Sequence, residues 1–316
     1  MNMNENPQHH AGAIPRKIIR GILKIGLLEW IVGIHLVVFI FRLINASDQA
    51  GAKPYLWKMI VVLALLALST LTYRGFFEGK TWCRSLHQAI IVTCVFIPFF
   101  MLQKMIPIIN PVEMDAKLSA IDHALVGLDA SVWLERFATT FTSAWFAVSY
   151  FGYYIIGGSF ILGMMFFCKR QDLLVEFGFI LLGAACIADI TYTIVPARGP
   201  YHYLASVFAG PLPGETIVPF VHQFIKNGPL RDVFPSMHTC IPLSMFLFSV
   251  KYFRTVAIIT GLWIPHIILS TMFLRYHYLI DVLAGIFLAF ALFAIARPSL
   301  DAYQKLRLRM GVVASP

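Results

Sequence analysis

Charged residues are scarce in this sequence. Asp, Glu, Lys and Arg make up 13% of its 316 residues, while 59% are hydrophobic. A soluble domain carries about 25% charged residues, and a water-facing globule could not bury so much apolar surface. The composition therefore excludes an ordinary soluble domain and predicts a polytopic membrane protein.

Patterns for disulfides and metals are also scarce. The five cysteines show no CxxC pair and no metal-ligand spacing, and most lie in apolar runs, which is typical of small buried hydrophobes. No His-x3-His pair and no acidic cluster supports a metal site. We therefore expect neither a metal nor another cofactor.

A basic stripe, an internal repeat and a cleaved signal are missing too. The net charge of +9 comes from residues scattered over short loops and both tails, so nucleic acid is not an expected partner. Residues 1–15 are polar, and the first apolar run is too long and too interrupted for a signal peptide.

Eight apolar runs are long enough to be transmembrane candidates, although the sixth is short for a span. They predict an all-α, polytopic transmembrane helix bundle of about eight helices. The runs lie at about 22–45, 56–73, 87–109, 144–167, 173–195, 237–252, 254–274 and 278–296.

These runs divide the chain into five expected parts. The segment 110–143 carries acidic residues at irregular helical spacing and is expected to lie in the membrane interface. Residues 196–236, rich in Pro and Gly, are expected to cap one face of the bundle. The parts are a polar cytoplasmic tail (1–21), N-terminal transmembrane helices (22–109), the interfacial segment (110–143), a second transmembrane domain (144–296) and a basic cytoplasmic tail (297–316).

Helix counting assigns the loops to two sides of the membrane. Fifteen of the 25 Lys and Arg residues fall on the side that holds both ends of the chain, which predicts that this side is cytoplasmic. The compact tails favour a bacterial inner membrane. Three polar motifs share the other, periplasmic side: Arg198-Gly199-Pro200, Pro235-Ser236-Met237-His238 and the segment 275–281.

These motifs carry the groups needed for phosphoryl transfer. Proline favours the first position of a helix, and the free N–H groups that follow suit an anion. Ser236 adds a hydroxyl group, and Arg198 can offer a planar fork to phosphate oxygens. His277 and Asp281 share a face if the chain is helical there, so the carboxylate could fix the tautomer of a nucleophilic imidazole. Zinc held by two histidines and an aspartate is the alternative interpretation.

The motifs resemble those of the type 2 phosphatidic acid phosphatase superfamily. Residues 235–238 are similar to its PSxH motif, residues 277–285 to its HYxxDVLAG motif, and Arg198-Gly199-Pro200 to the end of its first motif. The resemblance covers about 140–296, six helices of which could form the core. It implies a metal-independent site with His277 as nucleophile, His238 as proton donor, Asp281 orienting His277, and Arg198 and Ser236 binding phosphate.

Two cations of that family pattern are missing here. Thr191 and Thr271 stand where the family has Lys and Arg, and Arg275 is the candidate replacement. With the segment 121–129, this pattern is similar to the inositolphosphotransferase branch, which resembles inositol phosphorylceramide synthases. Tyr201 and His202, with the two threonines, are candidate pocket residues.

The predicted function is transfer of a phosphoryl or phospho-headgroup from a membrane lipid through a phosphohistidine. An alcohol as acceptor makes the protein a phosphotransferase, and water makes it a lipid phosphatase. A membrane transporter is one alternative, since Asp189 and Glu176 lie within apolar runs. A catalytically inactive protein of the same fold is the other.

Overall fold

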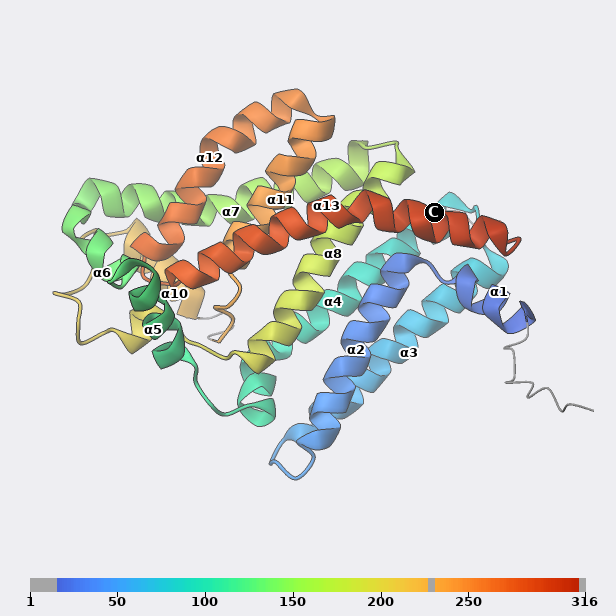
Figure 1. Ribbon diagram of the computed structural model, residues 1–316, viewed down its shortest axis with the longest axis horizontal. Helices are drawn as coiled ribbons and strands as arrows, with labels where there is room; N and C mark the ends of the chain where they lie inside the picture. Colours follow the sequence, from blue (N-terminus) through green and yellow to red (C-terminus); the bar gives the residue numbers. More distant parts are fainter. Residues whose placement is uncertain (1–15, 227–230, 313–316) are drawn as a thin grey trace, which may run out of the picture.

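The computed structural model describes residues 16–226 and 231–312, which form thirteen α-helices and one short 3₁₀ helix, without a β-strand (Figure 1). The helices are α1 (Arg16–Lys24), α2 (Leu27–Asn45), α3 (Ala52–Phe76), α4 (Thr81–Ile109), α5 (Asp115–Val126), α6 (Ala130–Leu134), η1 (Glu135–Phe137), α7 (Thr140–Phe167), α8 (Gln171–Ile194), α9 (Pro200–Tyr203), α10 (Ile217–Lys226), α11 (Met237–Tyr252), α12 (Arg254–Phe273) and α13 (Leu279–Arg309).

The long helices account for all eight apolar runs. Seven of them, in the described residues, are long and apolar enough to cross a membrane: α2, α3, α4, α7, α8, α12 and α13. The eighth, α11, has 16 residues, or about 24 Å at 1.5 Å per residue, and is shorter than the hydrocarbon core. The protein is an all-α, multi-pass membrane protein.

Helix α8 lies at the centre of the bundle. It packs against α2 and α4 on one side and against α11 and α13 on the other (Figure 1). One apolar cluster joins α2, α3, α4 and α8, and a second joins α7, α8, α11 and α13. The fold is therefore two helix groups that share α8.

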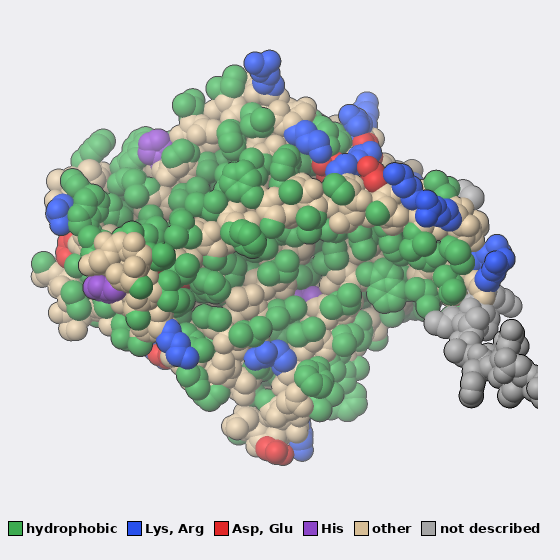
Figure 2. All heavy atoms as spheres, in the orientation of Figure 1, with side chains coloured by type: hydrophobic (Ala, Val, Ile, Leu, Met, Phe, Trp, Pro, Cys, Tyr) green, Lys and Arg blue, Asp and Glu red, His purple; other side chains and the backbone are tan. Residues whose placement is uncertain are grey.

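The surface matches a membrane environment. Hydrophobic side chains cover most of the face in Figure 2, and Lys and Arg gather most densely along the edge formed by the C-terminal half of α13. Large apolar residues such as Phe100, Phe166 and Phe287 are more than 70% exposed, which suits contact with lipid rather than water.

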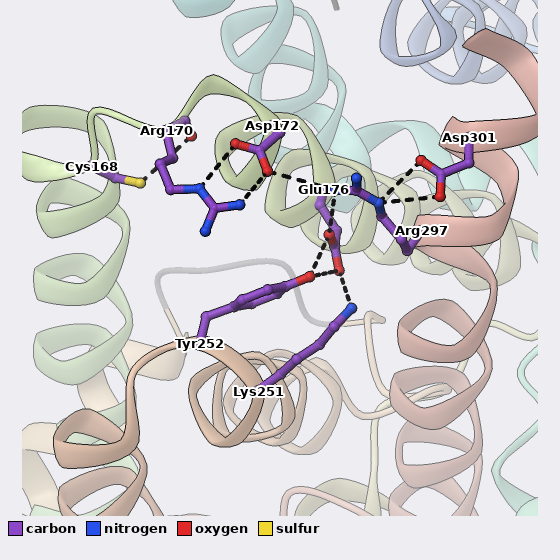
Figure 3. Close-up of polar contacts among 8 residues, drawn as sticks. All are labelled: Cys168, Arg170, Asp172, Glu176, Lys251, Tyr252, Arg297 and Asp301. Carbon is purple, nitrogen blue, oxygen red and sulfur yellow. Dashed lines mark hydrogen bonds and ion pairs between the residues drawn. The ribbon is translucent and has the colours of Figure 1, made fainter. Parts of the chain in front are cut away.

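Acidic residues within the spans are paired, as burial of charge requires. Glu176 of α8 is fully buried and accepts hydrogen bonds from the Lys251 Nζ at 2.9 Å and the Tyr252 hydroxyl at 2.8 Å. Arg297 of α13 lies 3.6 Å away (Figure 3). These contacts tie α8, α11 and α13 together at the end of α8 where the helix begins.

A second ionic cluster ties the N-terminal helices together. Glu29 of α2 accepts a hydrogen bond from Arg74 of α3 at 2.7 Å, and its carboxylate lies 3.1 Å from the His87 Nε2 of α4. Deeper in the bundle, His35 Nε2 lies 3.3 Å from Asp189 Oδ2, with both side chains buried. Within the described residues, Glu29, Asp189 and Glu176 thus have basic neighbours, the arrangement of structural ion pairs.

Two segments differ from the expected division of the chain. The segment 110–143 forms separate short helices, α5 and α6, followed by η1, because Gly127 takes a left-handed φ of 76° and ends α5. Helix α13 continues through Pro298 to Arg309, so most of the expected basic tail is helical. Residues 1–15 of the expected N-terminal tail lie outside the described residues.

Candidate active site

The first motif is held in place by Asp115 at the start of α5. Its carboxylate accepts hydrogen bonds from the backbone N–H groups of Arg198, at 3.0 Å, and Gly199, at 2.8 Å. The Tyr278 hydroxyl donates to the same carboxylate at 2.9 Å. One buried side chain therefore ties the loop after α8 to the residue that precedes α13.

Gly199 is required where this loop meets the third motif. Its φ of 84° lies in the left-handed region, which favours glycine. A Cβ there would also collide with the Tyr276 carbonyl oxygen. Beyond it, the Tyr201 N–H donates to the Arg275 carbonyl at 2.6 Å, so the two segments run side by side.

The second motif begins α11 against α13. The helix starts at Met237, with Ser236 as its N-cap, so Pro235 precedes the helix and does not occupy its first position as expected. The Ser236 N–H donates to the Asp281 carbonyl at 3.0 Å. A Cβ on Gly285 would lie 2.5 Å from the Ser236 carbonyl oxygen, so glycine permits this close approach.

His277 and Asp281 are neighbours, but not as two residues on one helix face. Helix α13 begins at Leu279, and Asp281 occupies its third position, where its carboxylate accepts the Tyr278 N–H at 2.8 Å. This cap turns Asp281 Oδ2 toward His277, whose Nδ1 lies 3.4 Å away. The buried carboxylate, with 0% side-chain exposure, can thus orient the imidazole by capping the helix.

His238 completes the cluster from the first turn of α11. The centroids of its ring and of the His277 ring are 6.3 Å apart, with the planes tilted by 49°. His238 Nε2 is buried and has no hydrogen-bond partner among the described residues. Two imidazoles, one beside a carboxylate and one with an unsatisfied nitrogen, can act on one phosphoryl group as nucleophile and proton donor.

The comparisons with known proteins agree with this geometry. A family model described as the PAP2 superfamily matches residues 116–295, which is more than half of the chain. The chain belongs to the PAP2 superfamily. No curated protein and no solved structure matches it. Membership in the PAP2 superfamily indicates a phosphatase-type enzyme that acts on lipid-type substrates in a bilayer.

In this PAP2 protein the Arg198 side chain points to a surface carboxylate. Its Nε donates to Glu113 Oε1 at 2.7 Å, and Arg231 donates to the same oxygen at 2.8 Å. The Arg198 side chain is 44% exposed. The backbone of Arg198 therefore lies at the site, while its guanidinium is paired with Glu113 and would have to change rotamer to reach a phosphate.

Arg275, the candidate replacement for the missing cations, is paired with protein groups. Its guanidinium donates to Glu135 at 2.9 Å and to the Gly210 carbonyl at 2.8 Å, and it lies over the Phe208 ring at 3.9 Å. The backbone at Arg275 has a left-handed φ of 69°, a reversal that the sequence did not indicate. These contacts make Arg275 a tie between η1 and the 204–214 loop, and its phosphate-binding role stays a prediction.

The four candidate pocket residues lie in different surroundings. The hydroxyls of Thr191 and Thr271 both donate to carbonyls of their own helices, at 2.7 Å. The Tyr201 ring packs 4.8 Å from His222, and His202, which is exposed, packs edge-on to Tyr201 at 5.1 Å. Burial lowers the pKa of His222 to about 4, so this cluster is uncharged at neutral pH.

Asp232 is a site residue that the sequence did not single out. It lies in a parallel bridge with Ala197, between the first and second motifs. Burial raises its pKa to about 7, and the charge of His277 acts in the opposite direction. A polar residue in a Pro- and Gly-rich loop has no periodic signal, so only the fold reveals that Asp232 lies near enough to His277 for their charges to act on each other.

Proposed function

We propose that this protein transfers a phosphoryl or phospho-headgroup from a membrane lipid through a phosphohistidine on His277. The observation that carries the proposal is the pairing of His277 with Asp281 at 3.4 Å, facing His238 across 6.3 Å between ring centroids. Membership in the PAP2 superfamily supports a reaction of this class.

In the first half-reaction, His277 Nε2 attacks phosphorus and forms the P–N bond while the bond to the leaving oxygen breaks. The Asp281 carboxylate holds the proton on His277 Nδ1, away from the attacking nitrogen, and stabilises the cationic His277 ring. His238 Nε2 gives its proton to the leaving oxygen, which departs as an alcohol. Ser236 and, after it leaves Glu113, Arg198 are the proposed phosphate contacts.

In the second half-reaction, an acceptor hydroxyl attacks the phosphohistidine. His238, now neutral, takes the acceptor's proton as the P–N bond breaks, which restores both imidazoles. The same proton transfers apply whether the acceptor is water or an alcohol. The threonines at 191 and 271 and the 121–129 segment favour an alcohol acceptor, as in the inositolphosphotransferase branch.

The proposed setting is a bacterial inner membrane with this site on the periplasmic side. Support comes from the loop charges and from the gathering of Lys and Arg along the C-terminal half of α13 (Figure 2). The motifs lie at the other ends of α8 and α11 from the Glu176 cluster.

The test is to incubate purified protein with radiolabelled phosphatidic acid, phosphatidylinositol or a polyisoprenyl diphosphate, with and without a lipid alcohol. An acid-labile, alkali-stable phosphoprotein is expected in the wild type. In His238→Ala it should form only slowly, because the leaving oxygen has lost its proton donor. His277→Ala should form none. Chelator in every assay should make no difference. Label retained in His277→Ala, or activity that requires zinc, would exclude the proposed mechanism.

A further inference from the structure

Three tyrosines of α7 face His238. Tyr150, Tyr153 and Tyr154 are spaced three and four residues apart, so they share one side of the helix. The Tyr150 ring lies 4.2 Å from the His238 ring at an interplanar angle of 17°, and the Tyr153 ring lies 4.1 Å away at 36°. Tyr154 meets the imidazole edge-on at 5.6 Å.

The imidazole lies between the first two tyrosines. The Tyr150 ring is nearly parallel to His238 and the Tyr153 ring is tilted to it, and both ring centroids lie about 4 Å from that of His238. Two six-membered rings this close would collide if they covered the same face. They must therefore cover opposite faces. Tyr150 is 3% exposed, and its ring is further packed by Tyr276 at 4.9 Å, so at least one side of this sandwich is held by its own neighbours.

The two histidines of the site are thus held by different means. His277 has a carboxylate beside its Nδ1. His238 Nε2 is buried without a hydrogen-bond partner among the described residues, so no hydrogen bond at that atom sets the direction of the ring. A sandwich fixes the ring plane, and with it the direction in which the unpartnered Nε2 points.

We propose that Tyr150 and Tyr153 are positioning residues that clamp the His238 imidazole and aim Nε2 at the leaving oxygen. This inference rests on the proposed function, in which His238 is the proton donor. The ring, rather than the hydroxyl, is the part of each tyrosine that matters.

The experiment compares two phosphate esters with different leaving groups. One is phosphatidic acid or phosphatidylinositol, whichever the wild type turns over, whose diacylglycerol alkoxide must be protonated as it leaves. The other is 4-nitrophenyl phosphate, whose phenolate leaves without a proton. In single-turnover assays, Tyr150→Leu and Tyr153→Leu should lower the rate of phosphoenzyme formation from the lipid ester by about 10²-fold, the lower range of general-acid effects. The rate of phosphoenzyme formation from 4-nitrophenyl phosphate should be nearly unchanged.

The matched variants keep the aromatic ring or change the outer tyrosine. Tyr150→Phe and Tyr153→Phe should retain wild-type kcat on both esters, and Tyr154→Leu should have a small effect, because Tyr154 is 38% exposed and does not stack. Turnover of 4-nitrophenyl phosphate by the Leu variants also shows that they are folded.

The outcomes separate this inference from the function beneath it. Equal losses on both esters in the Leu variants, or equal effects of Phe and Leu, would overturn the clamp while the wild type remains active. A wild type that turns over no phosphate ester would instead overturn the proposed function.

Discussion

Asp281 uses one carboxylate for two neighbours. Its Oδ2 accepts the Tyr278 N–H at 2.8 Å and lies 3.4 Å from His277 Nδ1. Its backbone carbonyl also accepts the Ser236 N–H. The side chain therefore caps α13 and orients the proposed nucleophile at the same time, and these two roles can be separated by substitution.

Asp281→Asn should keep the cap and lose the charge. The amide oxygen can still accept the Tyr278 N–H, but it cannot stabilise a cationic His277, so kcat should fall by about 10²- to 10⁴-fold, as for triad carboxylates. The melting temperature should change little. Asp281→Ala should lose both activity and melting temperature. A large loss of melting temperature in Asp281→Asn would show that the charge is structural.

Asp232 should make stability depend on pH. Because burial raises its pKa from 3.8 to about 7, the folded protein holds a proton that the unfolded chain has lost between these values. Stability from this group is complete below pH 3.8 and is lost as the pH rises through 7. Asp232→Asn cannot ionise, so its gain in melting temperature over the wild type should be larger at pH 8 than at pH 5. Equal shifts at both pH values would contradict the assignment.

Two carboxylates of helix α5 hold neighbouring segments in place. Asp115 holds the first motif and Tyr278, while Asp122 accepts the N–H groups of Leu279 at 2.7 Å and Ile280 at 2.9 Å. The first N–H groups of α13 are thereby satisfied by protein and are not free for phosphate. This helix, which is expected to lie in the membrane interface, fixes the segment that carries His277.

Asp122→Ala should loosen the start of α13. Removing a helix cap costs about 0.5–2 kcal/mol, so the melting temperature should fall. The kcat should fall with it, because His277 lies two residues before the first freed residue, Leu279. Asp122→Asn keeps one acceptor oxygen, so its melting temperature and kcat should lie between those of the wild type and of Asp122→Ala. Lys117→Ala, on the exposed side of the same helix, is the control. An effect of Lys117→Ala as large as that of Asp122→Ala would contradict the role of Asp122 in fixing the start of α13.

The sequence was informative where the physics is local or periodic. Runs of about 20 apolar residues predict helices because spanning a membrane leaves little choice, and each of the eight became a helix. The hydrogen bonds of Asp115 link residues 83 to 163 positions apart, and no periodicity signals them. The turn at Arg275 was missed for a similar reason, since a left-handed Arg has no sequence signature.

The whole molecule combines a part that matches the PAP2 superfamily with an N-terminal group of helices that lies outside the match. The family match begins at residue 116, yet α2 and α4 pack against α8 over an extensive apolar cluster. His35 of α2 also reaches Asp189 of α8. The N-terminal helices are therefore built into the same bundle and support the helix that leads to the first motif.

The proposed orientation can be tested with cysteines at two ends of the bundle. In a chain whose native cysteines are replaced, Ser206→Cys should react with a membrane-impermeant maleimide on intact cells, because the 204–214 loop lies on the motif side. Lys169→Cys should react only after permeabilisation. Both positions are exposed. The reverse labelling pattern would invert the topology.

The hydrogen bonds of Asp115 also determine when, during synthesis, the site can be complete. Its partners include the Tyr278 hydroxyl, 163 residues further along the chain, and the site needs the start of α13 to be in place. When α2 to α12 have been synthesised and inserted into the membrane, the bundle therefore still has an incomplete site. In the proposed mechanism, phosphate chemistry begins only when the last helix is in place, so a chain that ends before α13 should be inactive.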